Sequence, residues 1–328
     1  MATLLLQAAG SFLGGFLGPV GAAIGSAAGA TAGYLVDRAL IDSTQHYTRG
    51  KLASAAPFTA EDGAPIPRVY GAARVGGTMI WATRFEESRK TKRQGFKGGA
   101  SVTTYSYFAN VAFLLCEGEI AGLRRIWADG RELDQTLYEI RVYQGTEDQQ
   151  PDPLIEAKQG SGNTPAYRGS AYIVFEHFPL GDYGNRIPQF QFEVLKPAGD
   201  LHKQIRAVAL IPGATEYGLS PDPITYAAQK GASEAVNRHV LTARSDLVAS
   251  LDELQALCPN VENIGLVVTW FGNDLRAGQC AIRPMVTQAD PHGFSQDWKV
   301  SGIERADAPV VSMVNGAAAY GGTHPTGL

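Results

Sequence analysis

Two short groups of side chains have the types and spacing that hydrolytic chemistry uses. Glu117 and Glu119 flank Gly118, and paired carboxylates act as acid and nucleophile in glycosidases. Two carboxylates so close together after an apolar run more often belong to a tight turn, so we do not expect catalysis from this pair. Trp270 and Asp274 follow a second apolar run, at the position where (β/α)₈ barrels place catalytic groups. Only about 60 residues follow that run, too few for a barrel of ~250 residues, so we expect no barrel active site within this sequence.

The histidines and cysteines do not form a metal-binding pattern. None of the six histidines has a second His or Cys at ligand spacing. The sequence also lacks GxGxxG, GxxxxGK[ST] and GxSxG. We therefore expect no cofactor, no metal and no enzyme activity. The three cysteines are far apart and odd in number, which argues against a disulfide framework: Cys116, Cys258 and Cys280.

Residues 86–99 are densely basic and almost free of apolar side chains. A run of this kind is either a solvated hairpin tip or a basic loop that touches phosphate or an acidic partner. Phe96 and Tyr105 are the only candidates for stacking on bases, which gives little support for a nucleic-acid-binding module. The basic residues are Arg89, Lys90, Lys92, Arg93 and Lys97.

The N-terminal segment has no charged residue before Asp37. Pro19 divides it into two expected helices, over residues 2–17 and 20–41. Residues four apart share one helix face, so glycines at that spacing form a groove that lets another backbone approach closely. The glycines fall into two such runs, Gly10, Gly14, Gly18 and Gly21, Gly25, Gly29, Gly33.

These helices need close packing, because each glycine costs a helix about 1 kcal/mol relative to alanine in water. Three interpretations remain for residues 1–41: a helical segment buried in a protein assembly, a segment that enters a membrane transiently, or a disordered one. A secretory signal is not expected, because the apolar stretch has no basic region before it.

Residues 60–197 show the pattern of a β-rich domain with long loops. Apolar alternation predicts strands over 66–83 (with breaks at its glycines), 105–116, 140–143, 171–175 and 189–194. Asp129-Gly130 between apolar residues predicts a hairpin turn. The polar, Pro- and Gly-rich stretch 144–167 predicts a loop that reaches a neighbour or decorates the surface. A barrel or a sandwich fits this order.

The last third has the beginnings of an α/β arrangement. Residues 237–257 have helical spacing, with Ser250 or Asp252 as a possible cap and Cys258-Pro259 as the end. Residues 264–271 form a continuous apolar run typical of a buried parallel strand. The fold class predicted is mainly β, with an N-terminal Gly/Ala-rich helical segment and a C-terminal α/β portion.

Composition agrees with a subunit of an assembly. Charged residues are 18% of the 328, and 38 are glycine, fewer charges and more glycines than in a typical soluble domain. A net charge of −4 argues against a polyanion-binding protein overall, although a local basic patch remains possible.

Three motifs together resemble one protein family: VYGAARVGGTMIWATRFEE (69–87), FANVAFLLCEGEIAGLRRIWADGREL (108–133) and YRGSAYIVFEHFPLGDYGNRIPQFQFEV (167–194). The family is the large baseplate hub protein of gene transfer agents and related siphophages, often called the megatron. The motifs are more distantly similar to tail-tip host-specificity proteins of lambda-type phages. Residues 237–284 resemble the start of that family's TIM-barrel-like domain. Family members are more than twice this length, so the sequence resembles their N-terminal part.

The resemblance implies a structural role in a virion. Such proteins form a trimeric hub at the tail tip, close the tail channel, and open to let the tape measure protein and DNA pass into the host. The resemblance also implies several partners: two further copies of the chain, the distal tail and other baseplate proteins, the tape measure protein and DNA in transit. The host membrane is a possible partner of residues 1–41. The alternative is a glycan or peptidoglycan hydrolase whose β-rich part is an adaptor.

The expected organisation has three parts. Residues 1–45 form a Gly-zipper helical segment, residues 60–200 a β-rich tail-hub domain, and residues 201–328 a second hub-like part with the start of a truncated TIM-barrel-like domain.

Overall fold

The computed structural model describes residues 2–16, 18–19, 22–32, 46–49, 65–93, 101–211, 213, 215–229, 231–290 and 292–325. The fold is mainly β, as the sequence predicts. The chain divides into two compact units. The first contains Met1–Phe58, Arg84–Ala109 and Pro179–Ile187, and the second contains Thr59–Thr83, Asn110–Phe178 and Pro188–Leu328.

Two sheets of the second unit face each other across an aromatic core. One sheet has the order β2-β10-β6-β7, and β3, β8 and β9 belong to the other sheet together with the second half of β5. Phe175 of β9 stacks on Phe190 of β10 with ring centroids 4.5 Å apart, and Phe113 of β5 contacts both rings. Burying each such ring contributes roughly 1.5–3 kcal/mol. The strands are β2 (Gly71–Gly76), β3 (Thr78–Ala82), β5 (Ser101–Glu117), β6 (Gly122–Ala128), β7 (Arg131–Glu132), β8 (Glu139–Tyr143), β9 (Ser170–Pro179) and β10 (Phe190–Lys196).

Gly77 lets the chain pass from one sheet to the other. It lies between β2 and β3, and a Cβ there would come within 3 Å of side-chain carbons of both Phe113 and Phe192. A larger residue would have to displace the aromatic core, so the glycine break in the 66–83 run marks the step between the two sheets.

The expected hairpin at Asp129-Gly130 is confirmed. Both residues have positive φ, 49° and 79°, and they connect β6 to β7. Two successive residues of positive φ are what a two-residue turn of type I′ requires.

The stretch 144–167 is not a loop throughout, and the expectation is wrong for residues 153–159. It contains the helix α3 (Pro153–Gln159), whose Ile155 is buried beside Leu114 and Tyr172. The helix covers the β5 and β9 face that points away from the aromatic core, which explains why β5 is apolar on both faces towards its end.

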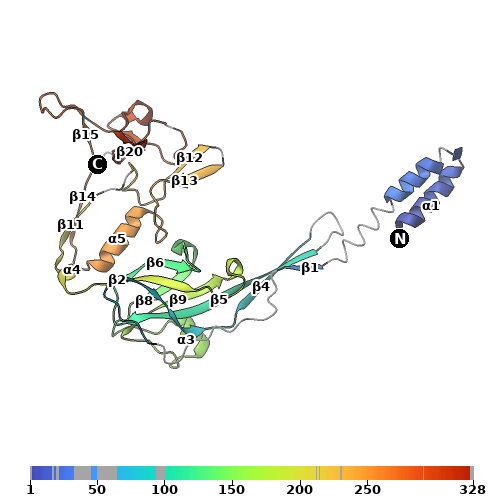
Figure 1. Cartoon of the computed structure of the whole chain (residues 1–328), viewed down its shortest axis with the longest axis horizontal. Coiled ribbons are helices and arrows are strands. Elements are labelled where there is room, and N and C mark those ends of the chain that lie inside the picture. Colours follow the sequence, from blue (N-terminus) through green and yellow to red (C-terminus); the bar gives the residue numbers. More distant parts are fainter. Residues whose placement is uncertain are drawn as a thin grey trace. The chain divides into compact units, whose positions relative to one another are not determined.

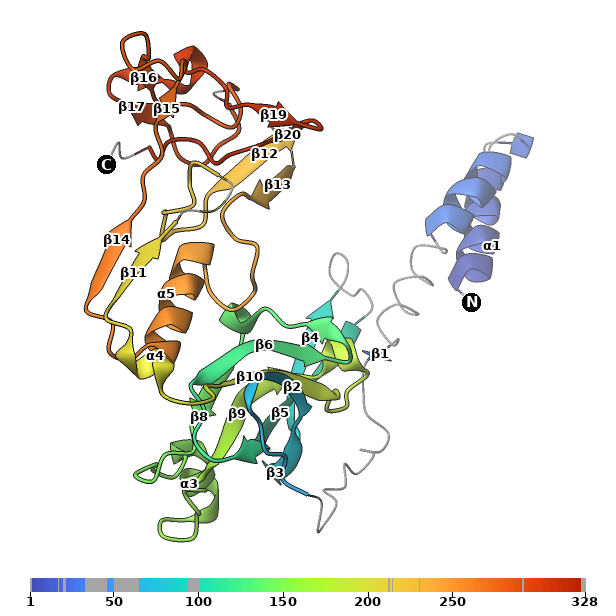
Figure 2. The same ribbon diagram turned by 60° about the vertical axis from the view of Figure 1, so that its left-hand side comes forward.

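The C-terminal part of the second unit has a separate core and a small parallel β-α-β arrangement. Its core contains Val286, Trp298, Val300 and Ala308. Strands β11 and β14 pair in parallel and α5 lies between them in sequence (Figure 2). Its elements are α4 (Leu201–Gln204), β11 (Ala207–Leu210), β12 (Thr225–Gln229), β13 (Ala232–Ala235), α5 (Asp246–Leu257), β14 (Asn263–Leu266), β15 (Phe271–Gly272), β16 (Ile282–Arg283), β17 (Lys299–Val300), β18 (Ile303–Glu304), β19 (Met313–Val314) and β20 (Ala317–Ala318).

Two expectations for this part need correction. The helix begins at Asp246 with Ser245 as its N-cap, not at residue 237 with Ser250 or Asp252, although it ends before Cys258 as predicted. The strand in the 264–271 run is parallel but not buried, because β11 is its only strand partner among the described residues. A parallel sheet is normally covered on both faces, and here Ile264 and Leu266 remain exposed.

The first unit contains the N-terminal helices and a β-hairpin that we call the arm. The helix α1 (Ala2–Gly15) is followed by a second helical stretch over residues 22–32. In the arm, β4 (Glu86–Arg93) pairs antiparallel with the first half of β5, and β1 (His46–Arg49) pairs in parallel with β5 at residues 101–104 (Figure 1).

Candidate functional site

The predicted basic residues lie on a strand and not in a hairpin loop. Arg89, Lys90, Lys92 and Arg93 belong to β4, so the expectation of a loop is wrong for these four, and Lys97 lies outside the described residues. Strand formation has a local cause, because Thr91 and its cross-strand neighbour Thr103 are β-branched and their hydroxyls are 3.0 Å apart. These basic residues therefore belong to a regular antiparallel pair of strands, β4 and β5.

A second contact fixes the base of the arm. The hydroxyl of Tyr107 donates to Glu87 Oε2 at 2.8 Å across the β4–β5 ladder, and Leu180 N donates to the carbonyl of Tyr107 at 2.9 Å. Tyr107 is buried. The arm thus has one face held against the chain near residue 180.

The N-terminal helices pack on each other through one of the predicted glycines. A Cβ at Gly29 would overlap the carbonyl of Leu6 and lie 3.1 Å from Cα of Gln7, and Gln7 Nε2 donates to Ser26 Oγ at 3.4 Å. Gly29 therefore serves as a close-approach position between two helices of one chain, as the glycine spacing predicts in general terms.

The other zipper glycines have different positions. Gly10 and Gly14 lie in α1, and Gly25 lies one turn before Gly29 in the second helical stretch. Gly18 has a φ of 88° and no atom within 4 Å of the position of a Cβ, so no second backbone approaches it closely. Gly21 and Gly33 lie outside the described residues.

The outer surface of these helices is apolar. Phe12 and Phe16 are 73% and 78% exposed and contact each other edge to face at 5.6 Å, and Leu13 and Ile24 are also exposed. Residues 2–32 contain no charge. Within the described residues, no helix is both long and apolar enough to cross a membrane. At 14 residues α1 is about 21 Å long, short of the ~30 Å hydrocarbon core.

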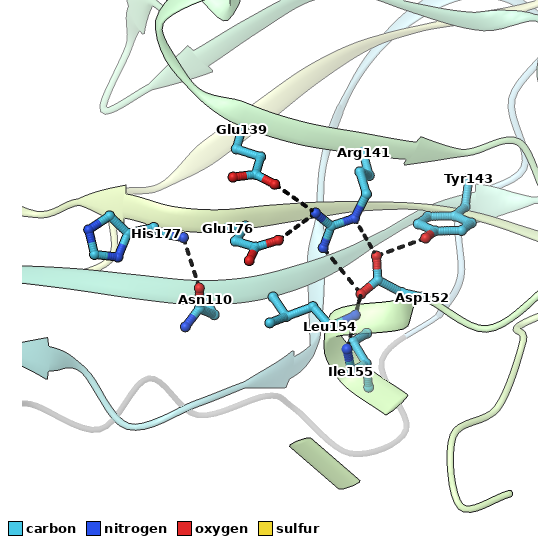
Figure 3. A network of polar contacts seen from close by, with 9 residues as sticks. All are labelled: Asn110, Glu139, Arg141, Tyr143, Asp152, Leu154, Ile155, Glu176 and His177. Atoms are coloured by element: carbon cyan, nitrogen blue, oxygen red, sulfur yellow. Dashed lines mark hydrogen bonds and ion pairs between the residues drawn. The ribbon is translucent and has the colours of Figure 1, made fainter. Parts of the chain in front are cut away.

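A polar network that the sequence analysis missed centres on Arg141 (Figure 3). Arg141 Nε donates to Asp152 Oδ2 at 2.7 Å, and its Nη1 donates to Glu176 Oε2 at 2.5 Å. Tyr143 OH donates to Asp152 Oδ2 at 2.8 Å. Asp152 also caps α3 by accepting from the backbone N–H groups of Leu154 and Ile155. The buried carboxylate of Asp152 thus joins β8 to α3, and Arg141 joins β8 to β9 through Glu176.

The protonation states of this network suit a structural role. Burial alone would raise the pKa of Asp152, but the hydrogen bonds from Arg141, Ile155 N–H and Tyr143 outweigh it and hold that pKa below its usual value. Burial, together with the bond to Asp152, raises the pKa of Tyr143 to about 12. The groups remain a charged pair and a neutral phenol near pH 7, so none of them is poised for proton transfer.

Figure 3 also shows how β5 holds the end of β9. The backbone N–H of His177 donates to Asn110 Oδ1 at 2.8 Å, and His177 has a positive φ of 50°. Asn110 Nδ2 in turn donates to Thr83 Oγ1 at 3.3 Å. A non-glycine residue in this conformation needs such support from its surroundings.

A second buried ion pair organises the C-terminal part. Arg305 Nη2 lies 2.6 Å from Glu216 Oε1 and donates to Tyr217 OH at 2.9 Å, while its guanidinium lies 4.0 Å from the centre of the Phe294 ring. Arg305 and Glu216 are almost completely buried. This cluster ties residues 216–217 to residues 294–305.

The residues considered for hydrolysis are not brought together as a catalytic pair. Glu117 is exposed and lies 3.9 Å from Arg68, and Asp274 forms a 2.7 Å ion pair with Arg276. Glu119 lines a cleft of about 520 Å³ with Lys196 and His202. No group of three possible metal ligands occurs in the part of the chain that the structure describes. Cys116 is buried, and burial raises the pKa of its thiol, which makes the thiol unreactive.

Comparison with known proteins reveals a sequence similarity to a chain of a solved virion structure. No protein-family model matches the chain, and no curated protein matches it. A solved structure, described as the virion of a native gene transfer agent (GTA) particle, contains a chain that is 38% identical in sequence. The match covers 56% of this chain and 39% of that chain, with a TM-score of 0.35. The superposition is too poor to inform the fold, so the similarity is one of sequence.

This similarity agrees with the coarser part of the predicted resemblance, namely similarity to a gene transfer agent virion protein. The finer predictions, a baseplate hub and a trimer, stay predictions. The chain spans about two fifths of the length of the chain it matches.

Proposed function

We propose that this chain is a structural subunit of a phage-like virion, and more specifically a hub subunit of the tail baseplate. In this role it closes the tail channel as a homotrimer and opens it for the tape measure protein and DNA. The sequence similarity to a gene transfer agent virion chain supports the virion role. The three β motifs described above support the hub, because they are what resembles that family.

One structural observation carries the assembly part of the proposal. At the start of β5, β4 pairs on one side and β1 on the other, and within the described residues β4 and β1 have no further strand partner. Open strand edges are sites where other strands add, and a closed ring of copies satisfies them. The arm is thus suited to pair with neighbouring copies.

The N-terminal helices support the same assembly. Phe12, Leu13 and Phe16 are exposed on an uncharged surface, and an apolar surface of this kind needs an apolar partner. In the hub, residues 1–41 either fill the channel beside their copies or face the target membrane. The glycan hydrolase alternative has no support from the described geometry, since Glu117 and Asp274 each lie beside an arginine.

Immunogold electron microscopy tests the virion role. An epitope tag in the exposed turn at Gly162, introduced in the organism that produces the particles, should be labelled at the tail end far from the capsid. A matched tag on a capsid protein gives the control pattern. Label on the capsid, or a tagged chain found only in the soluble fraction, would overturn the proposal.

A further inference from the structure

The antiparallel register divides the arm into two faces of different chemistry. Residues directly opposite each other in such a ladder share a face, and the faces alternate along each strand. Glu87, Thr91, Thr103 and Tyr107 lie on one face and contact each other in pairs. The opposite face, which we call the amine–hydroxyl face, consists of Ser88, Lys90 and Lys92 on β4 and Val102, Thr104 and Ser106 on β5.

The amine–hydroxyl face is open to solvent. Lys90, Lys92, Thr104 and Ser106 are exposed, whereas Thr103 and Tyr107 on the other face are buried. The acidic residue nearest to the lysines on this face is Glu86 at its base, four residues and therefore about 13 Å from Lys90. Neither lysine has an ion-pair partner among the described residues. The lysines thus present uncompensated charge.

The chemistry of this face fits a phosphate backbone. Lys90 and Lys92 are two residues apart on one strand, so their attachment points are separated by about 7 Å. Lysine amines and Ser or Thr hydroxyls are among the groups that contact phosphate and sugar in protein–DNA complexes. Ser88, Thr104 and Ser106 supply such hydroxyls beside the two amines.

The face favours duplex over single-stranded nucleic acid. Proteins that bind single strands combine basic grooves with aromatic side chains on which bases stack. Between residues 88 and 92 and their partners 102–106, the amine–hydroxyl face carries no aromatic ring, because Tyr105 lies on the other face. Backbone contact without base contact is independent of sequence.

We propose that the amine–hydroxyl face of the arm, Ser88, Lys90, Lys92, Thr104 and Ser106, binds the phosphate backbone of duplex DNA. The inference deepens the proposed function, because it names the partner of the arm during passage of DNA. It competes with a simpler explanation, that lysines on an edge strand only prevent unwanted strand pairing. The two differ in one respect: only the first requires DNA binding by the isolated chain.

The test measures binding of the full chain to a fluorescent 20-base-pair duplex by polarisation between 50 and 200 mM salt. The variant is K90A/K92A, and the matched control is K158A/K203A, which removes the same charge from exposed positions elsewhere. For two phosphate contacts, the slope of log K against log salt should become shallower by about 1.8 in the variant. The control should keep the wild-type slope. If the alanines weaken the strand, K90Q/K92Q should give the same loss with unchanged circular dichroism.

Two results would overturn the inference. The wild-type chain could fail to bind the duplex at 50 mM salt, or K158A/K203A could lose as much slope as K90A/K92A. If the wild-type chain fails to bind and K90A/K92A also blocks particle assembly, the face binds an acidic protein surface instead. Because this assay uses the purified chain, its outcome is independent of where immunogold places the chain in the virion.

Discussion

Gly29 lies against the carbonyl of Leu6 so closely that no side chain fits between the two N-terminal helices. The contact joins residues 23 positions apart in the sequence. Gly29 therefore allows two helices of one chain to pack closely. The exposed apolar surface of the same helices remains available for contacts in an assembly.

Replacing Gly29 by Leu should separate the helices, because the new side chain must displace the backbone at Leu6. Cysteines at Gln7 and Ser26, whose side chains are in contact, should form a disulfide in the otherwise wild-type chain but not beside G29L, as measured by peptide mass spectrometry. The control is Ala27→Leu, an exposed position of the same helix, which should leave the disulfide intact. Equal cross-linking in G29L and A27L would show that Gly29 is not a packing position.

The Arg141–Asp152 pair should dominate the stability of the β8, β9 and α3 region. Asp152→Asn removes the buried charge that Arg141 contacts, while Glu176 still pairs with that arginine, and loss of the charged hydrogen bonds should cost about 1.5–3 kcal/mol. Glu139→Gln, which removes an exposed partner of the same arginine, should cost less than about 1 kcal/mol. Urea unfolding at pH 7 measures both. Similar values for the two variants would contradict a structural role for Asp152.

The same pair predicts acid sensitivity. The pKa of Asp152 is lower in the folded chain than the ~3.9 of an unfolded aspartate, so the folded state favours the carboxylate. Its contribution to the free energy of unfolding is present above pH ~4 and is lost as the pH falls through the lowered folded value. Unfolding measured from pH 7 to pH 3 should therefore show a smaller acid-induced loss in D152N than in wild type. Parallel curves for the two proteins would refute this assignment.

The Glu216–Arg305 pair should hold the C-terminal part together in the same way. Glu216→Gln leaves a buried guanidinium uncompensated and should cost about 3–5 kcal/mol. The matched control is Glu304→Gln, which breaks the exposed pair with Lys299 and should change stability by less than about 1 kcal/mol. Proteolysis of residues 207–325, followed by mass spectrometry, should be faster for E216Q only. Unchanged proteolysis of E216Q would argue against the pair as the organising contact.

The elements predicted best from sequence are those with local causes. Alternation from Tyr105 to Leu115 predicts β5, and Asp129-Gly130 predicts the turn between β6 and β7, because side-chain period and positive φ are properties of neighbouring residues. The helix α3 was missed although Asp152-Pro153 is an N-cap followed by Pro at the first turn, since the surrounding polar and glycine-rich composition favours a loop.

The candidate site was predicted only in part, and the reason is physical. Charge density locates Arg89 to Arg93, but only the pairing of Lys90 with Thr104 shows which side chains share a face. Similarly, glycine spacing indicates a packing face without indicating that Leu6 lies on it. Arg141 has two partners: Asp152, which lies beyond a loop, and Glu176, which lies on another strand. No sequence periodicity relates Arg141 to either residue.

The central proposal is that three copies of this chain form the hub of a tail baseplate. A cryo-electron microscopy map of intact particles, reconstructed at the tail tip, tests it most directly. The account predicts threefold density at the end of the tail channel into which residues 101–196 can be traced, with the arms pointing towards neighbouring copies. Tail-tip density that is resolved to side chains and cannot be built with this sequence would contradict it.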